Sequence, residues 1–296
     1  MTPLFTTYGI CVALGVLVAI LAFRANKEFR RDAGTLAICC IPSGIIGARL
    51  LYIVFRLPFF GMIGMERIFY LRDGGFLLYG AVLGICLAAA GYAKRRAIDC
   101  RRLLDAMTVP GLLCIAVCRM AEGSAGEGLG NWVENEALAF FPLASPNAYG
   151  EMQWAVFVLE AAAALCMAFI LIRWKALPGQ RFERGLALYA GCQIIFESLR
   201  MDSVLKIGFV RVSQVISAVI LLALVLICHL RQGEKQMALR GALVIVAGAG
   251  LIGGMEWALE KTQVSNLLIY LLMSLTAAVM TLRTIRAIDG RSFGKF

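Results

Sequence analysis

The sequence predicts an all-α membrane protein, a polytopic transmembrane helix bundle of about nine spans. Hydrophobic residues make up 60% of the 296 positions and charged residues only 16%, whereas soluble domains are nearer half apolar and a quarter charged. The apolar residues are gathered into runs long enough to cross a bilayer, which takes about 20 residues of helix. The basic residues, which give a net charge of +10, lie between these runs. That placement indicates contact with anionic lipid headgroups and not with nucleic acid.

Nine apolar runs are expected to be the membrane helices. They cover residues 6–23, 35–57, 75–93, 104–121, 152–172, 185–200, 210–230, 241–259 and 265–283. The first run differs from a signal peptide, because its basic residues follow it and no convincing small-residue cleavage site comes after it. We therefore expect it to be retained as the first helix.

The connections between the runs alternate in charge. Most Lys and Arg residues lie after the first, third, fifth and seventh runs and at the C-terminus, whereas residues 122–151 hold none. Basic loops stay on the cytoplasmic side, so we expect the N-terminus outside and the C-terminus inside. The glycine-rich, acidic segment 122–151 is then an outside loop. We expect an outward-facing site there, because long irregular loops are often functional.

The cysteines and the single histidine predict no metal site. Nine of the ten cysteines lie in the apolar runs, and no CxxC pair is present. His229 alone cannot complete a typical zinc site. We expect the cysteines to be packing residues.

Several ionisable residues lie where a charge is expensive. A charge at membrane depth costs about 2.5–3.5 kcal/mol on insertion scales, so each one needs a reason. The candidates are Arg49, Asp105, Arg119, Glu122, Glu160, Glu197, Arg200 and Glu256. Arg49 lies in the middle of its run, where we expect either an internal partner such as Glu160 or a lipid phosphate. Glu256 has no explanation in the sequence beyond a contact between helices.

Arg119 lies at the outer end of the fourth run, in the segment CRMAEGSAGEGLG (118–130). Glu122 would share its face if the helix continued that far. The four glycines in residues 123–130 predict that it does not. We expect a charged helix end followed by a backbone that can approach a ligand closely. The alternative is an arginine that extends to the interface beside a solvated acidic loop.

Glu197 and Arg200 form a second charged group, three residues apart at the outer end of the sixth run, with Asp202 after them. One interpretation is a structural ion pair that closes the end of a helix. The other is a site that places a guanidinium beside an outer-leaflet phosphate, which the planar fork of arginine binds bidentately.

Four segments of the chain resemble one protein family. They are GARLLYIVF at 47–55, DGGFLLYGAVLG at 73–84, CRMAEGSAGEGLG at 118–130, and YAGCQIIFESLRMD with VSQVIS at 189–202 and 212–217. In their order, spacing and position relative to the runs they resemble the bacterial prolipoprotein diacylglyceryl transferases, membrane enzymes that lipidate lipoprotein precursors. The resemblance covers about residues 6–230. It implies a seven-span transferase-like domain at 1–232, followed by an additional two-span segment at 233–296.

The resemblance also implies roles for individual residues. It implies catalytic positions at Tyr79, Arg119, Glu127 and Glu197. It implies substrate-binding positions at Arg49, Arg119, Gly130, Gln193, Arg200 and Gln214. Arg119 would hold the lipid phosphate, and Glu127 or Glu197 would accept the thiol proton or orient an arginine.

The chain departs from the family pattern at several of these positions. Tyr79 stands where the family usually has histidine, and Gln193 stands where it has an arginine implicated in the reaction. Arg200 or Arg49 is expected to supply the missing charge. Two asparagines of the family signature are replaced, by Glu122 and Ala125.

The resemblance implies a transferase that moves a diacylglyceryl group from phosphatidylglycerol to the lipobox cysteine thiol of a lipoprotein precursor. Sulfur would displace a phosphate at carbon, so one group must take the thiol proton and cations must stabilise the leaving phosphate. This chemistry requires no metal or organic cofactor. The implied location is the bacterial plasma (inner) membrane, crossed several times, with no nucleic-acid partner.

The departures leave two alternatives open. One is a catalytically inactive paralogue that binds phospholipid or lipoprotein precursor, and the other is a transferase with a different lipid donor or acceptor. A transporter is not favoured, because the sequence contains no visible inverted repeat.

Overall fold

The computed structural model describes residues 7–70, 74–202, 205–262 and 265–290. The chain forms two compact units, one of residues 20–107 and one of residues 1–19 together with 108–296. Asp73, which opens one of the family-like segments, lies outside the described residues.

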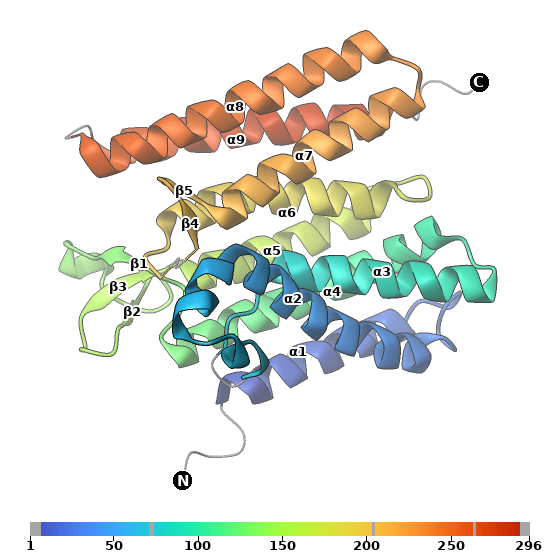
Figure 1. Ribbon diagram of the computed structural model, residues 1–296, viewed down its shortest axis with the longest axis horizontal. Helices are drawn as coiled ribbons and strands as arrows, with labels where there is room; N and C mark the ends of the chain where they lie inside the picture. Colours follow the sequence, from blue (N-terminus) through green and yellow to red (C-terminus); the bar gives the residue numbers. More distant parts are fainter. Residues whose placement is uncertain (1–6, 71–73, 203–204, 263–264, 291–296) are drawn as a thin grey trace. The chain divides into compact units, whose positions relative to one another are not determined.

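A helix lies at each of the nine predicted runs. The α-helices of the described residues are α1 (Thr7–Arg24), α2 (Ala33–Ile63), α3 (Leu78–Arg96), α4 (Cys100–Ala125), α5 (Val156–Arg173), α6 (Gln180–Leu199), α7 (Val212–Arg231), α8 (Lys235–Lys261) and α9 (Asn266–Asp289) (Figure 1). Seven of them are long and apolar enough to cross a membrane, and α3 and α6 are not among the seven. The helix α6 carries four charged side chains, and α3 ends in three basic residues. The all-α polytopic class is confirmed, while the count of nine spans and their orientation stay predictions.

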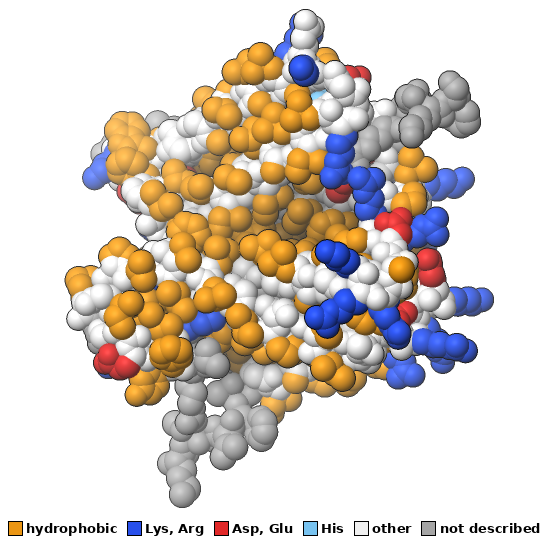
Figure 2. All heavy atoms as spheres, turned by 45° about the vertical axis from the view of Figure 1, so that its right-hand side comes forward, with side chains coloured by type: hydrophobic (Ala, Val, Ile, Leu, Met, Phe, Trp, Pro, Cys, Tyr) orange, Lys and Arg blue, Asp and Glu red, His pale blue; other side chains and the backbone are white. Residues whose placement is uncertain are grey.

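Hydrophobic side chains cover much of the face that Figure 2 shows. Ile38 and Val54 of α2 are 75% and 65% exposed, and Leu239 of α8 and Leu275 of α9 are both 63% exposed. Single exposed apolar residues are ordinary on soluble proteins, but whole helix faces of them are not. These faces suit the hydrocarbon of a bilayer.

In the unit of residues 20–107, glycines bring α2 and α3 into close contact. A Cβ at Gly47 would collide with the carbonyl oxygen of Gly80, and a Cβ at Gly84 would collide with that of Ser43. Small residues at such a crossing let two membrane helices pack backbone to backbone. This crossing fixes where α3 begins, and therefore where Tyr79 lies.

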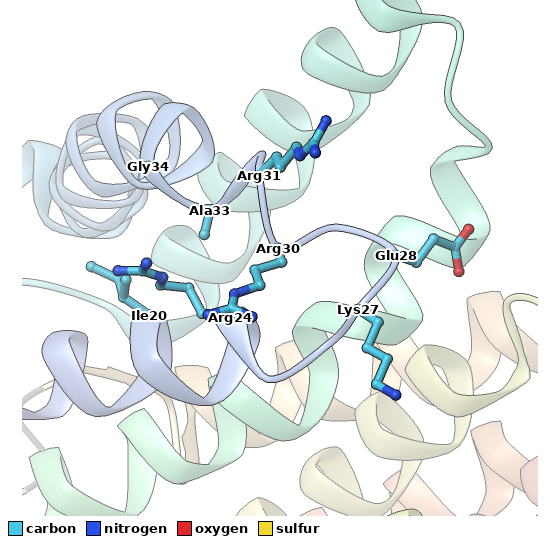
Figure 3. Close-up of a pocket in the computed structure, with 8 residues that line it drawn as sticks. All are labelled: Ile20, Arg24, Lys27, Glu28, Arg30, Arg31, Ala33 and Gly34. Atoms are coloured by element: carbon cyan, nitrogen blue, oxygen red, sulfur yellow. The ribbon is translucent and has the colours of Figure 1, made fainter.

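The loop after α1 surrounds a basic pocket of about 960 Å³ in the same unit (Figure 3). Its lining residues are Ile20, Arg24, Lys27, Glu28, Arg30, Arg31, Ala33 and Gly34. The side chains of Arg24 and Arg30 lie close together there, whereas Glu28 points away. None of the predicted site residues lines this pocket. Its charge suits the contact with anionic headgroups that we expected of the basic loops.

In the second unit, α6, α7, α8 and α9 share one core. Ile194, Val225, Ile245 and Met273, one from each of these helices, are at most 1% exposed. A Cβ at Gly191 of α6 would collide with Thr281 of α9, so this glycine permits the close approach of the last helix. The division of the chain at residue 232 stays a prediction.

Residues 122–151, which we expected to form an irregular outside loop, contribute two strands to an antiparallel sheet, and the third strand follows them. Its strands are β1 (Leu129–Trp132), β2 (Ala144–Pro146) and β3 (Met152–Ala155), in the order β1-β3-β2. A second hairpin, β4 (Lys206–Ile207) and β5 (Val210–Arg211), precedes α7. The short helices η1 (Met65–Phe69) and η3 (Glu136–Leu138) complete the described elements. Strands of two to four residues are too short to leave an alternating pattern in the sequence.

The prediction that the fourth helix ends soon after Arg119 is wrong. The helix continues through Glu122 to Ala125. The reason lies in Gly123, where a Cβ would come within 2.5 Å of the ring of Phe157. That glycine serves a close helix contact, and the chain turns only at Gly126, whose φ is 72°.

Candidate functional site

Two arginines and three carboxylates meet where α4 and α6 end and where α5 begins. We call Arg119, Glu122, Glu160, Arg200 and Asp202 the arginine–carboxylate cluster. The Arg119 Nη1 atom lies 2.5 Å from Glu122 Oε1, and its Nε atom lies 2.9 Å from Glu160 Oε2. The Arg200 Nη1 atom lies 2.8 Å from Glu122 Oε2 and 3.1 Å from Glu160 Oε2. Both glutamates therefore bridge the two guanidinium groups, and all four of these side chains are at most 11% exposed.

Asp202 joins the cluster to the glycine-rich turn. Arg200 donates to its two oxygens from Nε at 2.9 Å and from Nη2 at 2.7 Å, which is the bidentate geometry of a strong pair. The backbone N–H of Gly128 donates to Asp202 Oδ2 at 2.8 Å. Burial raises the pKa of Asp202, but the hydrogen bonds and charge of Arg200 and the Gly128 N–H outweigh it, so the pKa lies below its ordinary value.

The glycines of this turn let the backbone pass close to its neighbours. Gly128 has a φ of 73°, a conformation that glycine adopts without strain. A Cβ there would lie 2.7 Å from Phe157 Cβ, and one at Gly130 would lie 2.9 Å from the Leu199 carbonyl oxygen. The turn is also held by Phe157 N–H, which donates to the Gly128 carbonyl at 2.9 Å. The predicted substrate-binding position Gly130 is therefore a point of close packing beside the cluster.

Two tyrosines near the cluster were not predicted from the sequence. Arg119 Nη2 donates to the Tyr189 hydroxyl at 3.2 Å, and Tyr8 of α1 lies within electrostatic range of Arg119 and Glu122. A signal for Tyr189 was available, since Tyr189, Gln193 and Glu197 recur every four residues and share one helical face. Tyr8 had no comparable signal, because it stands alone in an apolar run.

Glu127 lies at the edge of the cluster with an exposed side chain. Partial burial raises its pKa, and the carboxylates of Glu122 and Asp202 raise it further, against the opposing charge of Arg200. A carboxylate with a raised pKa is a better proton acceptor than an ordinary one.

Gln193 and Glu197 lie side by side inside the unit. The Gln193 Nε2 atom donates to Glu197 Oε2 at 3.2 Å, and the two residues are 3% and 8% exposed. Glu197 is also within electrostatic range of Glu160. The predicted catalytic Glu197 therefore lies near the cluster, with an amide beside it where the resemblance implies an arginine.

Gln214 lies in the first turn of α7 and is 2% exposed. Its Nε2 atom donates to the Ile194 carbonyl at 3.1 Å and to Glu256 Oε1 at 2.5 Å, and its Oε1 atom accepts from the Arg211 N–H at 3.1 Å. Both amide hydrogens are thus engaged by the protein.

Arg49 and Tyr79 belong to the unit of residues 20–107. The Arg49 guanidinium donates to five backbone carbonyls: those of Arg67, Ile68, Tyr70, Gly74 and Gly75. The rings of Tyr52, Phe60 and Phe76 lie within 6 Å of it. Carbonyls of its own unit therefore solvate this mid-helix charge, while Glu160 is paired with Arg119 and Arg200. Tyr79 is 6% exposed at the start of α3.

The cluster has more carboxylates than guanidinium groups. One oxygen of Glu160, Oε1, is buried and has no hydrogen-bond partner in the part of the chain that the structure describes. Arg119 uses three of its five N–H groups on the described partners Glu122, Glu160 and Tyr189. The site can therefore offer N–H donors to a phosphate and carboxylate oxygens to a proton. Among the described residues, no group of three or more His, Cys, Asp or Glu side chains could hold a metal ion.

Most of the chain is similar to the proteins of one family. Residues 4–230 match the family model described as prolipoprotein diacylglyceryl transferase. The phosphatidylglycerol–prolipoprotein diacylglyceryl transferase of Clostridium novyi is 29% identical over 231 residues, which cover 74% of this chain and 89% of the relative. The enzyme of the same name from Clostridium kluyveri is 30% identical over 241 residues, covering 78% and 94%. That of Symbiobacterium thermophilum is 30% identical over 236 residues, covering 74% and 86%. Both α8 and α9 lie beyond the matched residues.

Proposed function

Because the chain belongs to the prolipoprotein diacylglyceryl transferase family, we propose that it moves a diacylglyceryl group from phosphatidylglycerol to a lipoprotein precursor. The family match and the relatives indicate a multi-pass membrane enzyme of the transferase class. They do not favour an inactive relative that only binds lipid. The acceptor in this proposal is the thiol of a lipobox cysteine, and the location is the bacterial plasma membrane.

The observation that carries the proposal is the meeting of Arg119 and Arg200. Both guanidinium groups contact the same two glutamates, Glu122 and Glu160, within 3.1 Å. Two cations held this close, at the outer end of the helices, are suited to one phosphate diester headgroup. Their side chains are fixed by ion pairs before any substrate arrives, so little reorganisation accompanies the reaction.

The proposed reaction is a displacement at carbon. The thiolate sulfur forms a bond to the glyceryl carbon, and the bond from that carbon to the phosphate oxygen breaks. Glycerol phosphate leaves with one more negative charge than it had as a diester. Arg119 and Arg200 stabilise that charge, as cations stabilise phosphates in phosphoryl transfer.

The thiol proton needs an acceptor, since the thiolate is the nucleophile. Glu127 fits this role because its side chain is exposed beside the cluster and its pKa is raised. Its proton then passes to water or to the departing phosphate. Glu197 and Gln193 lie further inside and hold the outer half of α6. Arg200 supplies the positive charge that Gln193 lacks.

A transfer assay tests the proposal. Purified protein is mixed with phosphatidylglycerol and a lipobox peptide, and the peptide mass is followed. The parent protein should add a diacylglyceryl mass, and Arg119→Gln should not. Arg102→Gln should behave as the parent, because Arg102 is 59% exposed and lies in the first turn of α4, whereas Arg119 lies near the end of that helix. A parent protein that is folded and adds no mass would refute the proposed function. The same assay is repeated with phosphatidylethanolamine in place of phosphatidylglycerol. A gain of peptide mass only with phosphatidylethanolamine would assign a different lipid donor.

A further inference from the structure

The last two helices share a core with α6, the helix after which Arg200 of the proposed site follows. They begin after residue 230, where the family match ends. Even so, Ile245 of α8 and Met280 of α9 are at most 1% exposed, buried against α6 and α7. At one end, Arg184 of α6 pairs with Asp289 of α9 at 2.6 Å. Figure 1 shows α8 and α9 running alongside α7.

Among the described residues of these two helices, Glu256 is the charged residue that is buried. It lies on α8, is 5% exposed, and accepts a hydrogen bond from Gln214 Nε2 at 2.5 Å. A carboxylate at such a position is expensive unless it is hydrogen-bonded. The amide of Gln214 meets that need, and its partner lies in the family-matched region.

The contact with Glu256 fixes which way the Gln214 amide points. A carboxylate only accepts hydrogen bonds, whereas an amide has one accepting and one donating end. The Gln214 amide must therefore turn its nitrogen, and not its oxygen, toward Glu256 on α8. The amide oxygen is left for the Arg211 N–H at 3.1 Å, and the second amide hydrogen reaches the Ile194 carbonyl at 3.1 Å.

The Ile194 carbonyl belongs to the functional half of α6. Ile194 follows Gln193 directly, and Gln193 is hydrogen-bonded to Glu197. The same helix ends at Leu199, and its C-cap is Arg200, the residue that contacts three carboxylates of the arginine–carboxylate cluster. One chain of contacts thus runs from α8 through α7 to the cluster.

From this geometry we infer that Glu256 is a positioning residue of the site, which orients Gln214 and through it holds residues 193–200 of α6 in place. The additional segment of the chain is thereby a working part of the enzyme. The inference rests on the proposed function for its effect on rate. Glu256 touches no substrate in this proposal, so its loss disturbs the alignment of residues 193–200 and not the binding of lipid.

The test compares full-length variants in phosphatidylglycerol-containing liposomes. Glu256→Leu removes the acceptor at similar size, Glu256→Gln keeps an acceptor oxygen, and Glu260→Leu is the matched control on the same helix. Glu260 is 42% exposed and pairs with Lys206 at 3.5 Å. Transfer kinetics and amide hydrogen exchange of residues 194–200 are measured for each.

We expect Glu256→Leu to lower kcat about tenfold or more, since small misalignments cost that much or more. Its KM for phosphatidylglycerol should stay near that of the parent, and exchange at 194–200 should accelerate. Glu256→Gln and Glu260→Leu should match the parent in both measurements. The double variant Glu256→Leu with Gln214→Leu should be no slower than Gln214→Leu alone.

Parent-like kcat and exchange in Glu256→Leu would overturn the inference, and so would additive losses in the double variant. If Glu256→Leu does not fold, Gln214→Leu takes its place, and parent-like exchange at 194–200 in Gln214→Leu would overturn the inference. Hydrogen exchange does not depend on turnover. A parent protein without transfer activity would therefore refute the proposed function, while the exchange comparison still decides the role of Glu256.

Discussion

Replacing Arg200 by glutamine should destabilise the protein strongly. The substitution removes the guanidinium that contacts Glu122, Glu160 and Asp202 at 2.7–3.1 Å, in a side chain only 11% exposed. Arg119 then remains as the one cluster cation for three carboxylates. Removing one partner of a buried ion pair costs about 3–5 kcal/mol, because the other charge stays buried without compensation.

Thermal unfolding in detergent micelles measures this loss. For a domain of 150–250 residues, 1 kcal/mol corresponds to about 2–4 °C, so the midpoint should fall by about 6–20 °C. The control Arg102→Gln removes contacts of 3.8–3.9 Å from a side chain that is 59% exposed. It should change the free energy of unfolding by about 0.5 kcal/mol or less.

The pH dependence adds a second check on the same reasoning. In Arg200→Gln, the carboxylates that Arg200 contacted are left with uncompensated negative charge. Protonation removes that charge, so the difference in thermal midpoint between the parent and Arg200→Gln should narrow as the pH falls. An Arg200→Gln shift no larger than that of Arg102→Gln would refute the view that this arginine neutralises the cluster. A difference in midpoint that widens at low pH would show that uncompensated carboxylate charge is not what destabilises Arg200→Gln.

Three further predictions follow from the site. Partial burial and the nearby carboxylates raise the pKa of Glu127, so the parent transfer rate should rise as the pH passes upward through that raised pKa. Glu127→Gln should lose this acid limb and about 10²-fold or more of the rate, and an unchanged pH–rate profile would exclude Glu127 as the base. The pKa of Asp202 is lower in the folded protein than in the unfolded chain. Its carboxylate therefore stabilises the fold fully at a pH above the unfolded-state pKa. That stabilisation disappears as the pH falls through the folded-state pKa. Asp202→Asn should therefore melt lower at neutral pH and show a shallower loss of midpoint with acid, whereas equal slopes would contradict the assignment. Gly126→Ala and Gly128→Ala share a positive φ that costs about 1–2 kcal/mol, but only the Cβ at 128 meets Phe157, at 2.7 Å. Gly128→Ala should cost about 1–3 kcal/mol more in unfolding measurements, and equal costs would rule out that contact.

The helix positions could be predicted from the sequence because the bilayer sets their length. Each apolar run coincides with one helix, to within several residues at most ends. The sheet of residues 129–155 could not be predicted in the same way. Its strands have three or four residues each, and contacts with Gly128 and Met201 far apart in the chain hold it in place.

The site was predicted in part. The cost of burying charge singled out Arg119, Glu160 and Arg200 correctly as residues that need partners. Which partners they have depends on the packing of α4, α5 and α6, and the sequence contains no record of that. The same limit explains Arg49, whose partners are backbone carbonyls and therefore have no signature in side-chain chemistry.

The pair between Arg184 and Asp289 has a consequence for how the protein is made. The two residues are 105 positions apart, and Arg184 is 4% exposed in the finished unit. At about 5–20 residues per second of synthesis, the ribosome reaches Asp289 about 5–20 s after Arg184. During that time the arginine of α6 lacks this partner. A helix translated later, α9, thus completes the ion pair of one translated earlier, and this pair of the second unit forms only after Asp289 has been made.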